Sequence, residues 1–300
     1  MMTTTPPILS TLPEQRHRLI ERIFARQNEQ GSWKITDPTL PIQLYLPKHT
    51  ATYHTLVTLA DLGCDPADPR LERPIQTMIR LMYRPEKGVF GITPQAYSNH
   101  EPSPCINGHI LYILGYFGKG GLYEASTVIQ HFAQYQRFDD GDFKTPRQYP
   151  YSGPTDHCYS RHTCYWGVTG LLKGLVYLPQ ETATPASESL KQKCIEFILR
   201  HEVCYSSHHP EQLIRGYIDK LRFPGMDDFM EILHMLGRAG VRDPRMGRAI
   251  QLLKSKRNPE GTWNLERPLS NSIVSIGKAG APNGFVTERA LEVLDGFYRG

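Results

Sequence analysis

The sequence has 300 residues, of which 39% are hydrophobic and 21% charged, and its formal net charge is +4. Its 34 basic residues are scattered among 30 acidic ones without a long Lys/Arg cluster, a pattern that argues against nucleic-acid binding. The first residues are polar and no apolar run is long enough to cross a bilayer, so we expect no membrane span and a cytoplasmic protein.

In chain order, hydrophobic periodicity predicts ten helices of two alternating classes. The outer class is amphipathic and covers residues 13–29, 69–83, 122–137, 186–202 and 244–256. The inner class is apolar on most sides and covers residues 50–62, 105–117, 160–177, 226–238 and 284–298. Because a helix that is apolar on most sides is buried on most sides, we expect an outer ring of helices around an inner one.

Two short phrases recur between these helices. A glycine followed two residues later by an aromatic residue occurs at Gly31, Gly88, Gly141 and Gly261, which are 57, 53 and 120 residues apart. A fixed period of this size is typical of a helical array. The second phrase, Asp-Pro, occurs at residues 68–69 and 243–244 and is typical of a helix start. We therefore predict an all-α fold in which residues 1–300 form one domain, a double ring of about five or six helix pairs.

The Gln27-x-x-x-Gly31-Ser32-Trp33 phrase, repeated with helix pairs between, resembles the prenyltransferase and squalene-cyclase superfamily of α/α toroids. The sequence is similar more narrowly to short, single-toroid, squalene-cyclase-like proteins. Three segments carry this similarity: 158–174, 223–233 and 285–291. The resemblance implies an α/α toroid with a central cavity. Such toroids include isoprenoid cyclases, zinc-dependent prenyltransferases, dehydratase-isomerases and non-enzymes, so the function has to be argued from a site.

Reactive side chains concentrate in the loops that enter the predicted inner helices. In a ring, these loops line one mouth of the central cavity, and helix N-termini there favour thiolate and carboxylate forms. We expect His162, Cys164 and Asp228 to act as catalytic acid–base groups.

Two Cys/His pairs are candidates for a metal site. Cys105 precedes His109 by four residues, and Cys158 precedes His162 by four, so each pair shares a helix face. Together the pairs can supply a tetrahedral zinc set. A metal-free Cys/His acid–base pair is an equal alternative, and packed thiols with hydrogen-bonded histidines are the structural alternative.

An aspartate-rich motif, Asp227-Asp228-x-x-Glu231, resembles the motifs that hold substrate diphosphates through Mg²⁺. We favour Mg²⁺ less than zinc, because short acidic motifs arise often by chance. The structural alternative is that Asp227 caps a helix and Glu231 is solvated or ion-paired.

Glycine and aromatic residues of the inner helices are candidates for substrate contacts. Gly167, Gly170 and Gly174 form one stripe of a helix, which indicates a close approach by a neighbouring helix or by a ligand. Aromatic residues near the same mouth can line an apolar cavity and stabilise a cation, or they can simply pack. The expected substrate-binding residues are Tyr112, Tyr165, Trp166, Gly167 and Gly170.

We therefore expect an enzyme whose apolar central cavity takes an isoprenoid-like or other hydrophobic small molecule. Acid–base chemistry of the lyase, isomerase or cyclase type, as in terpenoid-forming enzymes, is the leading hypothesis. One alternative is a zinc-dependent transferase or hydrolase with Cys and His ligands. The other is a non-catalytic toroid that binds a hydrophobic ligand or a partner chain.

Overall fold

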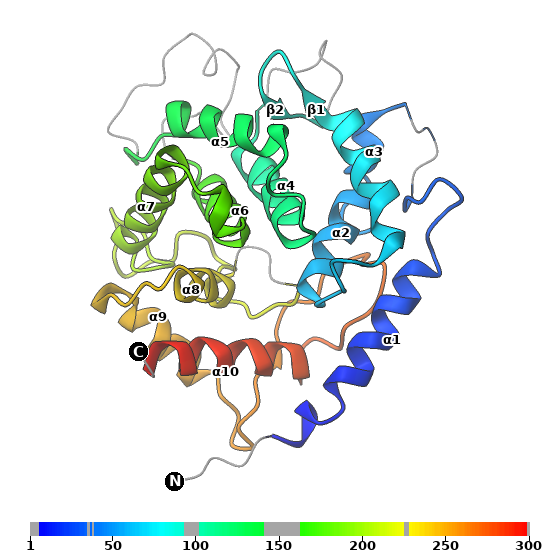
Figure 1. Ribbon diagram of the computed structural model, residues 1–300. Helices are drawn as coiled ribbons and strands as arrows, with labels where there is room; N and C mark the ends of the chain where they lie inside the picture. The colour runs from blue at the N-terminus through cyan, green and yellow to red at the C-terminus, as the bar shows by residue number, and fades with distance from the viewer. Residues whose placement is uncertain are drawn as a thin grey trace. The chain divides into compact units, whose positions relative to one another are not determined.

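The computed structural model describes residues 6–34, 37, 39–92, 102–140, 163–224 and 228–298, and these are mainly α-helical (Figure 1). Ten α-helices lie where the sequence predicts them. They are α1 (Leu12–Phe24), α2 (Thr52–Asp61), α3 (Glu72–Met82), α4 (Pro104–Tyr116), α5 (Tyr123–Tyr135), α6 (Tyr165–Tyr177), α7 (Pro185–Arg200), α8 (Phe229–Arg238), α9 (Gly247–Ser255) and α10 (Gly284–Tyr298). The prediction of an all-α fold is confirmed for these residues.

Strand structure in the described residues is limited to two short antiparallel pairs and one isolated bridge. In the first pair, β1 (Tyr83–Arg84) pairs with β2 (Val89–Phe90), and in the second, β3 (Asn264–Leu265) pairs with β4 (Ala281–Pro282). The bridge joins Tyr205 to Leu213. Both pairs include or adjoin a Gly–aromatic phrase, so they belong to the turns between helices.

The Gly–aromatic phrases form turns that require glycine. Gly31, Gly88 and Gly261 have φ angles of 74°, 65° and 81°, in the left-handed region that glycine adopts without steric cost. The turns at Gly31 and Gly261 are closed by the same hydrogen bond. In the first, the main-chain N–H of Asn28 donates to the carbonyl of Ser32, and in the second, the main-chain N–H of Asn258 donates to the carbonyl of Thr262. The repeat in the sequence is therefore a repeat in backbone geometry.

Each described turn is attached to the next α-helix along the chain. The main-chain N–H of the buried aromatic residue donates to a polar side chain in the first turn of that helix. These bonds join Trp33 to Thr52 Oγ1 (3.1 Å), Phe90 to Asn107 Oδ1 (2.8 Å) and Trp263 to Thr287 Oγ1 (3.0 Å). A buried N–H without a partner is costly, so this recurring bond fixes each turn on its helix.

The Asp-Pro phrases begin helices, as predicted. The carboxylates of Asp68 and Asp243 accept the main-chain N–H of Arg70 and Arg245, and both also bind the guanidinium of the same arginine. The proline follows as the first residue of a 3₁₀ turn, Pro69–Leu71 or Pro244–Met246, which leads into α3 or α9. Proline suits this position because its missing N–H has no helical partner there.

Contacts within the chain gather into two compact units. The first comprises Met1–Ala25, Asp61–Gly63 and Ile198–Gly300, and holds α1, α8, α9 and α10. The second comprises Arg26–Ala60 and Cys64–Phe197, and holds α3 to α6 with most of α2 and α7. That residues 1–300 act as one domain stays a prediction.

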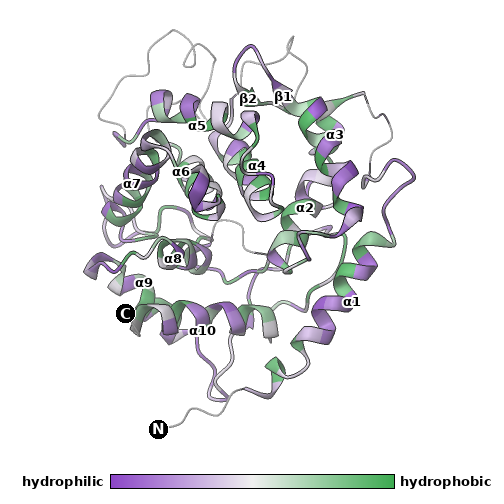
Figure 2. Ribbon diagram, viewed as in Figure 1, coloured by the Kyte–Doolittle hydropathy of each residue, from purple (hydrophilic) through white to green (hydrophobic). Residues whose placement is uncertain are grey.

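The two predicted helix classes differ in burial. Ten of the thirteen residues of α4 are buried, and so are ten of the thirteen of α6, whereas α1 buries only Leu12, Leu19, Ile23 and Phe24. Hydrophobic and hydrophilic residues accordingly alternate along α1 in Figure 2. In the described part of the chain, every helix is too short or too polar to span a bilayer.

Candidate functional site

The predicted site residues fall into three groups. Cys158, His162 and Asp227 lie outside the described residues. Asp228 belongs to the first unit. The second unit holds the others, which are Cys105, His109, Tyr112, Cys164, Tyr165, Trp166, Gly167 and Gly170. The convergence of all these residues on one cavity mouth stays a prediction.

The glycine stripe of α6 packs against α4. A Cβ atom added to Gly108 would lie 2.2 Å from the carbonyl of Gly170, and one added to Gly170 would lie 2.8 Å from the Cα of Cys105. Gly167 faces the ring of Pro104, and Gly174 faces the carbonyl of Gly108. The sequence indicated that either a neighbouring helix or a ligand lies against these glycines. The structure places the backbone of α4 there.

Cys105 and His109 lie one turn apart on α4. Cys105 is partly buried at the contact with α6, whereas the His109 ring is buried. The Nδ1 atom of His109 lies 2.8 Å from the hydroxyl oxygen of Tyr53, which comes from α2. This bond orients the imidazole ring of His109. No group of three or more His, Cys, Asp or Glu side chains within the described ranges is placed to hold a metal ion.

A histidine–tyrosine cluster adjoins His109 at the start of α2. The His54 ring packs within 4.8 to 5.2 Å, centroid to centroid, of the rings of Tyr45, His49 and Tyr53. Only 4% of His54 is exposed, and among the described residues neither ring nitrogen makes a hydrogen bond of normal geometry. Burial lowers the pKa of His54 to about 3, with smaller contributions from His49 and Lys48, so the ring is neutral at physiological pH.

Lys173 is a buried lysine that was not among the residues predicted from the sequence. It is 2% exposed, and its Nζ atom lies 4.4 Å from the centroid of the Tyr112 ring. Tyr112 also packs edge-on against Tyr177, with centroids 4.6 Å apart. Tyr112 was expected to contact substrate, and the group that lies on its ring is the Lys173 side chain. The signal was present in the sequence, since Lys173 is the one charged residue between Tyr165 and Tyr177.

The start of α6 holds the other predicted residues of this unit. Cys164 is the N-cap residue and is partly buried. Tyr165 is buried, with its ring centroid 6.1 Å from that of Phe197 in α7, which is a packing contact. Trp166 is partly buried. Because Cys164 precedes the helix, the predicted inner helix at 160–177 begins later than expected.

In the first unit, Asp228 is the N-cap of α8. Its Oδ1 accepts the N–H of Glu231 (2.9 Å) and its Oδ2 accepts the N–H of Arg222 (3.1 Å). The residue is 1% exposed, and burial raises the pKa of its carboxyl group to about 7. The charge of Glu231 adds to the rise, while the N–H bonds and Arg222 oppose it. The structural alternative drawn from the sequence had Asp227, not Asp228, as the cap of this helix.

A buried ion pair adjoins this cap. Glu231 is 2% exposed and binds the guanidinium of Arg289 from α10 at 2.6 Å. Arg289 also binds Glu292, which lies 3.7 Å from the Nδ1 of His234. The two described carboxyl groups of the aspartate-rich motif thus bind the protein itself, and Glu231 is ion-paired as in the structural alternative.

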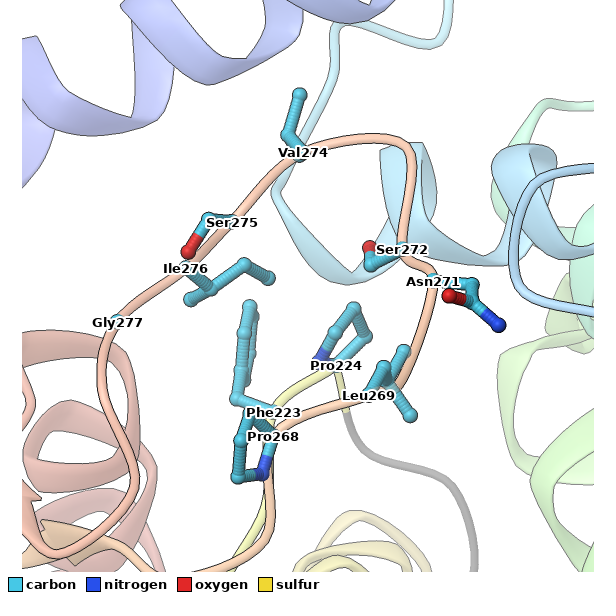
Figure 3. Close-up of a pocket in the computed structure, with 10 residues that line it drawn as sticks. All are labelled: Phe223, Pro224, Pro268, Leu269, Asn271, Ser272, Val274, Ser275, Ile276 and Gly277. Carbon is cyan, nitrogen blue, oxygen red and sulfur yellow. The ribbon is translucent and has the colours of Figure 1, made fainter.

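A pocket of about 220 Å³ lies in the same unit, beside Phe223 (Figure 3). Its walls are Phe223, Pro224, Pro268, Leu269, Asn271, Ser272, Val274, Ser275, Ile276 and Gly277. The Phe223 ring stacks on that of Phe285, with centroids 4.8 Å apart. Because Arg222, which binds Asp228, directly precedes Phe223, one short loop connects the pocket wall to the buried carboxyl group. This pocket could not be predicted from the sequence, since Pro268 to Gly277 come from a loop without periodicity.

No family model matches the sequence, and no curated protein was found to match it. The geometry of these sites therefore carries the functional argument.

Proposed function

We propose that residues 1–300 form a single α/α toroid of five helix pairs, related to the prenyltransferase and squalene-cyclase superfamily. The alternation of ten helices and the repeated turns support this proposal. So does the meeting of the chain's two ends, because α1 packs beside α10 (Figure 1). Arg16 forms an ion pair with Glu288, and a Cβ added to Gly284 would lie 3.0 Å from Leu12. A helical array whose last helix contacts its first is the arrangement that a ring requires.

Within this fold, we propose an enzyme that acts on an isoprenoid-like or other hydrophobic small molecule by acid–base chemistry. The reaction is of the lyase, isomerase or cyclase type, with Asp228 as the group that transfers the proton. The observation that carries the proposal is the pKa of about 7 at Asp228, in the same unit as a pocket with uncharged described walls. A carboxyl group with this pKa is about half protonated at neutral pH, so it can both donate and accept a proton.

A helix-capping role alone does not account for this pKa. Asp68 and Asp243 are caps of the same chain, and bonds to Arg70 and Arg245 lower the pKa of both carboxyl groups. Asp228 alone among these three is buried and has a raised pKa. Perturbed pKa values of this kind cluster at functional sites.

The test is turnover of a small panel of isoprenoids. Purified protein is incubated with linalool, geraniol, farnesyl diphosphate and squalene, and products are identified by gas chromatography with mass spectrometry. We expect Asp228→Asn to lower turnover at least about 100-fold, the usual contribution of a general acid. Asp243→Asn, a matched change at a partly exposed cap, is expected to leave turnover unchanged. Full turnover in Asp228→Asn, or no product from any of the four compounds, would overturn the proposal.

The zinc-dependent transferase or hydrolase remains a second candidate because of His109. Metal-bound histidines usually have their second ring nitrogen held by a hydrogen bond, and Tyr53 holds Nδ1 of His109 in this way. Zinc bound in a one-to-one ratio, measured by mass spectrometry of the metal and lost in His109→Ala, would favour this candidate. Absence of zinc from active protein would exclude it. Inactive, metal-free protein would favour the non-catalytic binding toroid.

A further inference from the structure

The pocket beside Phe223 has features that restrict its ligand. Its walls are formed by proline, aromatic and aliphatic side chains, together with Asn271, Ser272 and Ser275. None of the described lining residues is charged. The nearby Arg16 lies over the Phe285 ring and is paired with Glu288, and the main-chain N–H of Arg222 donates to Asp228.

The uncharged described walls disfavour an ionic ligand. A carboxylate or diphosphate placed among these walls would lose its hydration and find no counter-charge, which is a large cost. A neutral ligand loses only apolar hydration, and removing that surface from water favours binding. The walls therefore favour a neutral molecule.

The volume limits its size. A cavity of about 150 Å³ holds benzene, which corresponds to roughly 25 Å³ for each non-hydrogen atom. At that ratio, the volume of about 220 Å³ takes about nine such atoms. The pocket accordingly has room for a compact molecule with a single ring or about two isoprene units, and it is too small to hold a whole triterpene.

One polar atom marks where such a molecule is recognised. The Oγ atom of Ser272 is shielded from solvent and has no hydrogen-bond partner among the described residues. Figure 3 shows the Ser272 side chain turned toward the space inside the loop, opposite Ile276, whereas Asn271 points away. A buried hydroxyl without a partner costs about 1–3 kcal/mol, and a polar group on the ligand can supply that partner.

We propose that this pocket binds a neutral, compact, apolar molecule that carries one hydroxyl or carbonyl group, and that this group hydrogen-bonds to Ser272. The inference specifies the substrate class of the proposed function and rests on that function for its link to catalysis. The binding itself is tested without turnover, so the two proposals can fail separately.

The experiment is isothermal titration calorimetry at pH 7 with three probes of similar shape: 4-methylphenol, toluene and 4-methylbenzoate. We expect 4-methylphenol to bind one site per chain. Toluene, which lacks the hydroxyl group, is expected to bind about fivefold more weakly, the effect of one ordinary hydrogen bond. The charged 4-methylbenzoate is expected to bind at least about tenfold more weakly.

Variants assign the binding to the pocket. Ser272→Ala should weaken 4-methylphenol binding about fivefold and leave toluene unaffected. Ser270→Ala, an exposed serine of the same loop that is not among the lining residues, is the matched control and should change neither affinity. Ile276→Trp fills the pocket and should abolish binding, and Leu269→Trp fills it from another wall if the first variant melts early.

Four outcomes would overturn the inference. They are no binding of any probe, tighter binding of 4-methylbenzoate than of 4-methylphenol, equal effects of the two serine variants, and unchanged binding in a folded pocket-filling variant. None of these results bears on whether Asp228 transfers protons, which the turnover assay decides.

Discussion

Two effects act on the carboxyl group of Asp228 in opposite directions. Burial disfavours its charged form, whereas the hydrogen bonds from main-chain N–H groups favour that form. The pKa of the carboxyl group is about 7 in the folded protein against 3.8 in an exposed carboxyl group. The folded state therefore holds a proton that the unfolded state releases, and stability falls as pH rises from about 4 to about 7. Asp228→Asn removes this titration while keeping a capping oxygen, since Asn caps helices nearly as well as Asp.

We expect the stability of Asp228→Asn relative to wild type to rise by up to about 1.4 kcal/mol per pH unit over that range. Urea unfolding followed by circular dichroism at several pH values measures this difference. Parallel pH profiles of the two proteins would show that the carboxyl group titrates normally, and the argument for an acid–base role would lose its basis.

His54 has the opposite linkage. Its pKa is about 3 in the folded protein and 6.5 in an exposed histidine, so the unfolded state binds the proton first. Stability is fully present above pH 6.5 and is lost as pH falls, by about 1.4 kcal/mol per pH unit down to about pH 3. His49 and Lys48 reinforce this loss, because both disfavour a second positive charge beside them.

His54→Phe keeps a ring in the cluster and removes the titrating group. We expect its stability to fall less steeply than that of wild type between pH 6.5 and about pH 4. Thermal melts across this range measure the slope, with His17→Phe at an exposed position of α1 as the control. Equal slopes for wild type and His54→Phe would mean that His54 is accessible to water.

Among the elements, the α4–α6 pair depends most on residue size. A methyl group on Gly108 would overlap the backbone of Gly170, which cannot move without separating the two helices. We expect Gly108→Ala to destabilise the protein by about 3 kcal/mol or more, at the upper end for overpacking. Gly237 in α8 is the matched control, since nothing lies within 4 Å of its added Cβ.

In Gly237→Ala the added methyl group meets no neighbour, so helix propensity alone acts and stability should rise by about 0.5–1 kcal/mol. Denaturant midpoints of the two variants give the comparison. Similar midpoints for Gly108→Ala and wild type would show that α4 and α6 are not in close contact in solution.

At this scale the sequence was a reliable guide to the helices, because periodicity, Gly stops and Asp-Pro starts are local signals. All ten predicted helices are present, but several bounds differ from the prediction. At Cys164 and Asp228, extended N-cap residues were read as helix, α3 and α9 begin only after a 3₁₀ turn, and α1 ends at Phe24 rather than at residue 29. The partners of the stripe at Gly167 and Gly170 could not be predicted, since the sequence does not specify which helix approaches them. The burial of Lys173 and the Phe223 pocket depend in the same way on contacts between distant segments.

The chain as a whole passes between its two units four times. The first unit contains the three-residue segment Asp61–Gly63, which lies in sequence between the two parts of the second. It also contains both α1 and α10, so each unit is incomplete until distant parts of the chain have come together. If residues 1–300 form one closed ring, the two units should unfold together in a single transition.

The contact between the chain's ends offers a direct test of this cooperativity. Arg16→Glu places a like charge beside Glu288 and removes the guanidinium from the face of Phe285. The pair is partly exposed, so we expect a loss of about 1 kcal/mol and a melting temperature lower by about 2–4 °C. Glu288→Arg in the same chain restores opposite charges and should recover most of the loss. Differential scanning calorimetry must show one transition in all three proteins, with equal calorimetric and van't Hoff enthalpies. A scan of Arg16→Glu that splits, with one transition shifted and the other unchanged, would mean that the units are independent domains and that the ring does not close.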